Sequence, residues 1–241
     1  MAVFITSAAG GGSTGTSDRT VAITPGVADL IVFYCAASAN TNEAPTATDD
    51  RGGTYALVTT ALYKATTNAM ALFVRNQFVT AAVAHTITAA TGSNTSGEIV
   101  ACTFSSMART GASAVLQSKT VKNQAAGGTP AISFGSAVNT ANVTLGGIAN
   151  TTNPATVTGP VGWTERQDVG QARPNVGLEV VTRDSGFTST TVTWGGTSPT
   201  EFGGIIVELD ASTPVDIRFM RTPSSLDGCG VQGMFYGNRV A

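Results

Sequence analysis

The single histidine, His85, is the residue on which any serine- or cysteine-based hydrolytic mechanism in this chain would depend. It lies in the segment VAHTIT, where polar and apolar residues alternate as in a β-strand. Nothing around it in the sequence identifies a nucleophile, and one histidine without paired cysteines is a poor zinc site. We therefore expect His85 to be hydrogen-bonded on a strand face, and we expect no catalytic residue, cofactor or metal.

Two adjacent carboxylates, Asp49 and Asp50, stand in the glycine-rich stretch TDDRGGTY. Carboxylate and backbone oxygens in such a loop can bind Ca²⁺, whereas an aspartate in a turn can instead accept hydrogen bonds from its own backbone. We favour the turn. Glu165 with Asp168 or Asp184 has the residue types of a glycoside hydrolase pair, but no feature of the sequence selects such a pair.

Two further features suggest ligand binding. The loop AAGGGSTGTS at 8–17 follows a strand-like run, as phosphate-binding loops do, but it lacks their lysine and no amphipathic helix follows, so we interpret it as a turn. Tyr55, Trp163 and Trp194 would stack on sugars if they were exposed. Their positions on strand faces favour packing in the core instead.

Charge, hydropathy and cysteine usage limit the partners and the cellular compartment that we expect. The formal net charge of −2 does not support a nucleic-acid-binding surface. The longest apolar stretch, LIVFYCAA, is far shorter than the ~20 residues that span a bilayer, and the start of the sequence lacks the basic region of a secretory signal. Cys35 and Cys102 lie in strand-like runs, and Cys229 is distant from both. We expect buried free thiols, folding in a reducing cytoplasm, and neither nucleic acid nor membrane as a partner.

Short strands joined by tight turns must position these residues. Charged residues make up only 12% of the chain, and the 28 glycines and 9 prolines are spread along it as turn signals. Thr and Val favour strands, and no window has a convincing helical period. The predicted strands are 3–7, 20–24, 29–36, 55–60, 69–76, 82–89, 98–104, 131–134, 142–149, 163–169, 176–182, 189–194 and 204–210.

These strands repeat in order along the chain. Tyr55 and Trp163 each follow a glycine-containing turn and stand 108 residues apart. Four further alignments keep the same order with offsets of 105 to 113 residues: DLIVFYCA with NVTLGGIA, Leu72 with Leu178, Ile87 with Val192, and GEIVACTF with GGIIVELD. We predict an all-β fold in which two pseudo-repeated halves, about 18–107 and 130–211, bury one shared core as an antiparallel, jelly-roll-like β-sandwich. This domain covers residues 1–211.

The last segment, 212–241, abandons the strand alternation and has no equivalent after the first half. It is rich in aromatic, methionine and arginine side chains, which are enriched at interface cores. We predict an extended arm that docks on a partner subunit, and the alternative is a tail that packs on its own sandwich. The predicted contact residues are Arg218, Phe219, Met220, Arg221, Met234, Phe235, Tyr236 and Arg239.

The ordered segments resemble a family of two-half, jelly-roll-like β-sandwich domains found in tailed-bacteriophage virion proteins and in some bacterial secreted proteins. The similarity covers about residues 18–211, and one turn departs from the expected D-x-x-G-N-T-W pattern at Arg51, Gly52 and Tyr55. The segments that carry it are ADLIV (28–32), TDDRGGTY (48–55), ALFVRN (71–76), GPVGWTER (159–166), GLEVVTRD (177–184) and GGIIVEL (203–209).

The resemblance implies a structural or adhesive module without enzymatic activity. The first expectation is a homo-oligomeric capsid decoration or cement protein that binds the major capsid protein or other virion subunits. Such a protein would be located in the virion and assembled in the host cytoplasm. The alternatives are a tail or fibre protein that binds a receptor, and a bacterial carbohydrate-binding module.

Overall fold

The computed structural model is all-β and antiparallel, as predicted, with one short 3-10 helix among the described residues. Those residues are 2–11, 18–39, 45–64, 67–92, 96–125, 129–152, 157–172, 175–197 and 199–211. The first half contains β1 (Val3–Gly11), β2 (Arg19–Ile23), β3 (Leu30–Ser38), β4 (Thr46–Asp49), β5 (Tyr55–Lys64), β6 (Asn68–Arg75), β7 (His85–Ala90) and β8 (Ser96–Ser105). The second contains η1 (Gly111–Ala114), β9 (Val115–Ala125), β10 (Ala131–Ser133), β11 (Val143–Asn150), β12 (Val157–Thr158), β13 (Thr164–Ala172), β14 (Asn175–Arg183), β15 (Thr191–Thr193), β16 (Gly195–Gly196) and β17 (Glu201–Leu209).

The two halves have the same topology. The first half forms a five-stranded sheet in the order β1-β8-β3-β6-β5, and the second forms one in the order β9-β17-β11-β14-β13, which matches it strand for strand. A smaller sheet, β2-β7-β4, accompanies the first. Its counterpart is divided into the pairs β10-β15 and β12-β16, so that β15 and β16 together take the place of β7. The predicted repeat is therefore present in the strand order.

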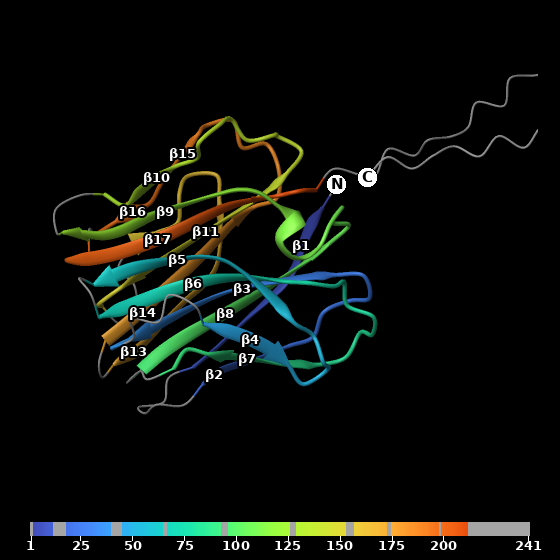
Figure 1. Cartoon of the computed structure of the whole chain (residues 1–241). Helices are drawn as coiled ribbons and strands as arrows, with labels where there is room; N and C mark the ends of the chain where they lie inside the picture. The colour runs from blue at the N-terminus through green and yellow to red at the C-terminus, as the bar shows by residue number, and fades with distance from the viewer. Residues whose placement is uncertain are drawn as a thin grey trace, which may run out of the picture.

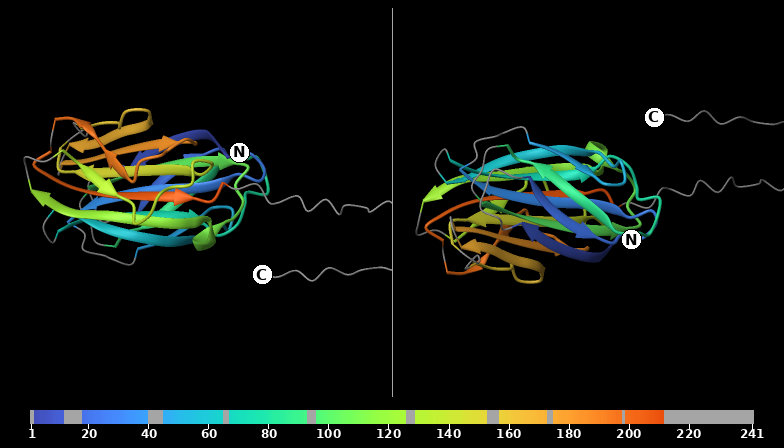
Figure 2. Two further views of the ribbon diagram at one scale, coloured as in Figure 1. Left: turned by 90° about the horizontal axis from the view of Figure 1, so that it is seen from above. Right: turned by 90° about the horizontal axis from the view of Figure 1, so that it is seen from below.

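The sheets stack in four layers, with the two large sheets in the middle and the smaller sheets outside them (Figure 1). Strands of the two large sheets run in nearly the same direction (Figure 2), which is the aligned packing of β-sandwiches. Each edge strand of one large sheet contacts an edge strand of the other. The first edge strand of the first half, β1, lies against β13, and the last, β5, lies against β9. These two contacts are equivalent in the repeat, so the halves are related by an approximate two-fold axis.

The fold has three hydrophobic cores, where one shared core was expected. The central core lies between the large sheets, and each half has a second core between its large sheet and its smaller sheets. In β3, Leu30 and Val32 face the central core, whereas Ile31 and Phe33 face the outer one. The run LIVFYCAA is therefore apolar throughout because both faces of its strand are buried. The expectation of a single core missed this second face.

One aromatic side chain crosses the centre of the molecule. Tyr34, the fifth residue of β3, is completely buried, and its hydroxyl donates a hydrogen bond to the carbonyl oxygen of Ile205 at 3.3 Å. Its ring lies against Gly147, the fifth residue of β11, where a Cβ atom would approach ring carbon Cδ1 to 2.7 Å. Tyr34 and Gly147 are thus equivalent positions that face each other across the two-fold axis. A large side chain fits there only because its counterpart has none.

We predict that Gly147→Ala lowers the free energy of unfolding by about 1–3 kcal/mol, because the added methyl group overpacks a core that cannot yield. Equilibrium urea unfolding measures the effect. A matched control is Gly135→Ala on the surface, where the new Cβ would meet only the end of the Lys119 side chain, at 3.1 Å. The cost should largely disappear in a Tyr34→Ala background, since the two changes share one contact. An equal cost in both backgrounds would show that the tyrosine ring is not the obstacle.

Candidate functional site

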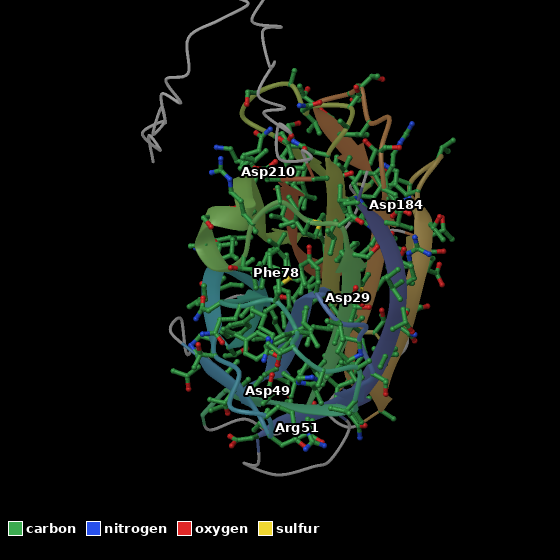
Figure 3. The ribbon with its side chains drawn as sticks, turned by 90° about the vertical axis from the view of Figure 1, so that its right-hand side faces the viewer. Asp29, Asp49, Arg51, Phe78, Asp184 and Asp210 are labelled. Atoms are coloured by element: carbon green, nitrogen blue, oxygen red, sulfur yellow. The ribbon has the colours of Figure 1, made fainter. Side chains whose placement is uncertain are left out.

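The turn between β4 and β5 is organised by the carboxylate of Asp49. Its Oδ1 accepts hydrogen bonds from the backbone N–H groups of Arg51 at 2.9 Å and Gly53 at 2.7 Å. This is the turn that was favoured over a calcium loop. Gly53 must be a glycine, because a Cβ at that position would overlap the Asp49 carboxylate and the Arg75 guanidinium. Figure 3 shows Asp49 and Arg51 together at one corner of the molecule.

The second oxygen of Asp49 gathers side chains from three strands. Oδ2 accepts hydrogen bonds from the Tyr55 hydroxyl at 3.0 Å and from Arg75 Nε at 3.1 Å, and it lies 3.3 Å from His85 Nδ1. The side chains of Asp49, Arg75 and His85 are 0%, 6% and 3% exposed. His85 is thus hydrogen-bonded on a strand, as predicted. Its Nε2 is buried without a partner among the described residues.

These contacts make the Asp49 cluster a closed, charge-balanced unit. Burial acts to raise the pKa of Asp49, but the hydrogen bonds from Gly53, Arg51, Tyr55 and Arg75 outweigh it, so the pKa lies below its ordinary value. Arg75 also donates to the carbonyl oxygens of Gln77 and Phe78. Both oxygens of the carboxylate are occupied by protein donors, so the cluster ties β4, β5, β6 and β7 together and has no free ligand for a cation.

We predict that Asp49→Ala lowers the free energy of unfolding at pH 7 by about 3–5 kcal/mol, because Arg75 is left buried without its counter-charge. The neighbouring Asp50→Ala serves as the control. Asp50 accepts a bond from the Thr86 N–H on the surface, so its loss should cost only about 1 kcal/mol. Because the pKa of Asp49 is lowered on folding, its contribution is present above about pH 4 and is lost as the pH falls. Urea unfolding at pH 7 and pH 3 checks both points, and a cost that does not shrink in acid contradicts them.

A pocket of about 510 Å³ opens at the corresponding place in the second half. Its aromatic lining consists of Trp163, Phe187 and Trp194, with the Trp163 and Phe187 rings edge to face at 5.3 Å. Arg183 and several hydroxyl side chains complete the wall. Trp194 is buried, as predicted, and its Nε1 has no acceptor among the described residues. Trp163 also packs against the outer core of the second half, as predicted, but it is only half-buried, so part of its ring is exposed at the pocket.

The strand register shows that the pocket and the Asp49 cluster are equivalent sites. Arg75 ends β6 and Arg183 ends β14, 108 residues later. This is also the offset between Tyr55 and Trp163. The sequence alignment of Leu72 with Leu178 was wrong by two residues: Leu72 lies opposite Tyr34, and the equivalent of Tyr34, Gly147, lies opposite Val180. With that shift, Arg75 and Arg183 do not align, although each follows a run of apolar strand residues.

A second buried carboxylate lies beneath this region. Glu179 on β14 is completely buried, and neither of its oxygens has a hydrogen-bond partner among the described residues. Burial raises its pKa to about 8, and the nearby charges of Glu165 and Asp168 add to the effect. Asp184 instead forms an ion pair with Arg166 at 3.5 Å. The carboxylates named for glycoside hydrolysis therefore do not line the pocket beside Trp163.

We predict that Glu179→Gln stabilises the protein more at pH 9 than at pH 5. A folded-state pKa of about 8, above the ordinary value near 4.3, means that wild-type stability falls as the pH rises and the buried carboxyl ionises. Glutamine has nearly the same shape and removes this ionisation. Melting temperatures of both proteins at the two pH values measure the difference. An equal gain at pH 5 and pH 9 would mean that ionisation of Glu179 is not the cause.

The two cysteines among the described residues lie inside the cores. Cys35 and Cys102 are buried free thiols, as predicted, and burial raises the pKa of each to about 12. Among the residues that the structure describes, no group of three or more histidine, cysteine, aspartate or glutamate side chains is placed to hold a metal ion. Within the same residues, no helix is long and apolar enough to cross a membrane.

The predicted arm, 212–241, lies outside the described residues, together with Cys229. Its contact residues therefore remain predictions. They are Arg218, Phe219, Met220, Arg221, Met234, Phe235, Tyr236 and Arg239.

The comparisons with known proteins identify no relative: no family model, no curated protein and no solved structure matches the chain.

Proposed function

We propose that this protein is a structural component of a tailed-bacteriophage particle, a homo-oligomeric capsid decoration protein that binds the major capsid protein. The proposal starts from the resemblance of its ordered segments to two-half, jelly-roll-like virion domains. One observation carries it further. The described residues up to Ala211 supply three cores and both large sheets, and the sequence then continues with interface-type side chains.

The sandwich provides a fixed base for such a continuation. The Ala211 N–H donates to Asn142 Oδ1 at 3.1 Å, and the Asp210 N–H donates to the carbonyl oxygen of Ala114 at 2.8 Å. The Asp210 carboxylate also pairs with Arg109 at 3.0 Å. Ala2 belongs to the same core as Ala211, and the start of β1 and the end of β17 lie at the same end of the sandwich (Figure 1). An arm that starts from an anchored residue can reach a neighbour without loosening the domain.

The composition of 212–241 suits a protein partner. The segment carries three arginines and five large apolar side chains among its predicted contact residues. Burying one such apolar side chain contributes about 1.5–3 kcal/mol. Arginines add bidentate bonds to carboxylates, which orient a docked segment. These are the terms by which an arm would hold a decoration protein to a capsid subunit.

We predict that a chain truncated after Ala211 keeps its β-rich circular dichroism spectrum and its melting temperature but no longer joins capsids. Co-sedimentation with particles assembled from the major capsid protein measures the second property. The full-length double variant Phe219→Ser/Phe235→Ser is the matched control, since it keeps the length of the arm and removes two of its apolar contacts. It should also fail to co-sediment. Truncation that unfolds the domain would mean that 212–241 belongs to its core, and truncation that leaves capsid binding intact would remove the arm from the proposal.

A further inference from the structure

The two equivalent sites differ in one decisive respect, the source of negative charge. In the first half, the Asp49 carboxylate and the His85 imidazole fill the space beside Arg75. His85 stands two positions before Ile87, and Thr190 stands two positions before its counterpart, Val192. Among the described residues, the second half places no aspartate, glutamate or histidine in the lining of its pocket. It has kept the arginine and the aromatic residue.

Arg183 is consequently a cation without a counter-charge. Its Nε donates to the carbonyl oxygen of Ser185 at 3.2 Å, and its Nη2 donates to that of Gly186 at 2.7 Å. Both acceptors are neutral. Arg183 forms no ion pair with a carboxylate in the described part of the chain, and its Nη1 has no acceptor there. Two carbonyl groups hold the guanidinium in place beside a pocket, which is the arrangement of a preorganised receptor for an anion.

The other residues that line the pocket indicate which kind of ligand would carry the anionic group. The half-buried Trp163, which the buried Phe187 ring supports edge to face, offers apolar surface for a ring-shaped ligand. Hydroxyl groups surround them, on Thr158, Thr188, Ser189, Thr191 and Thr193. Part of this set is already bonded within the protein, because Thr191 Oγ1 lies 2.7 Å from Ser133 Oγ. Aromatic surface combined with hydroxyl groups fits a sugar, which has apolar C–H faces and a hydroxyl edge. The volume of about 510 Å³ lies within the usual range for small-molecule sites.

We propose that this pocket binds a saccharide bearing a carboxylate, such as a uronic or sialic acid. The Arg183 guanidinium binds the carboxylate, taking from the ligand the charge that Asp49 supplies to Arg75 in the first half. Trp163 packs against the sugar ring. Val161, which is 99% exposed and also lines the pocket, forms part of its rim. The inference concerns residues 158–195 and does not depend on the arm or on its capsid partner.

Isothermal titration of the full-length protein tests the ligand class. The probes are galacturonate, glucuronate and N-acetylneuraminate, with galactose and glucose as the neutral counterparts of the two uronates and acetate as the carboxylate without a ring. At least one acidic sugar should bind about tenfold or more tightly than its neutral counterpart and than acetate. No binding of any acidic sugar overturns the proposal. Equal binding of a uronate and its neutral counterpart overturns the role of the carboxylate.

Substitutions at the rim test the location without disturbing the core. Val161→Asp places a negative charge beside the pocket and should weaken binding of the acidic sugar about 3- to 10-fold at low salt. Val161→Lys should leave it unchanged or strengthen it. The control is Val27→Asp, at a 63% exposed valine in the first half, which should have no effect. Arg183→Gln should abolish the preference for the acidic sugar. Identical affinities for Val161→Asp, Val161→Lys and wild type would place the sugar elsewhere.

Discussion

The contact of the Tyr34 ring with Gly147 is the constraint on which the rest of this structure depends. It brings the two five-stranded sheets to close packing at the approximate two-fold axis, where equivalent positions of the halves must face each other. A perfectly symmetric repeat would place two identical residues there, either two rings that collide or two glycines that leave a void. The sequences of the halves must therefore differ at the axis, and the Tyr34 hydroxyl uses that difference to bond β17 of the other half.

Burial on both faces of the large sheets follows from the same arrangement. The central strands of each large sheet, β3, β6 and β8 in one and β11, β14 and β17 in the other, are enclosed almost throughout. Their outer faces require a cover, and the smaller sheets provide it. This requirement explains how so weakly charged a chain hides its apolar residues. Two buried carboxylates, Asp49 on β4 and Glu179 on the outward face of β14, lie on or beneath these covers.

Sequence reasoning could predict the strands and the repeat because both depend on local patterns. Alternation and turn residues mark strand ends, and an alignment that is wrong by two residues still keeps each side chain on the correct face, as it did for Leu72 and Leu178. The burial of both faces of β3 could have been predicted, because a strand with one buried face alternates polar and apolar residues, whereas LIVFYCAA is apolar at every position. What covers the outer face depends on distant strands and could not be predicted. The contact of Asp49 with Arg75 and His85 forms only where β4, β6 and β7 come together in the fold. The spacing of these residues in the sequence does not predict that contact.

The Asp49 cluster and the pocket beside Arg183 show how equivalent strands can build a structural cluster in one half and an open pocket in the other. In the first half, the chain supplies the carboxylate, the arginine bonds to it, and the space closes as a structural cluster. In the second half, no acidic side chain of the described residues lines the corresponding pocket, while the arginine is still held by backbone carbonyl groups. Backbone carbonyl groups position the cation in both halves, those of Gln77 and Phe78 for Arg75 and those of Ser185 and Gly186 for Arg183. A pocket that keeps the arginine but has no acidic side chain in the described part of its lining is therefore an open site, and in our proposal its missing partner is an anion. The stability of this half then depends on its other contacts.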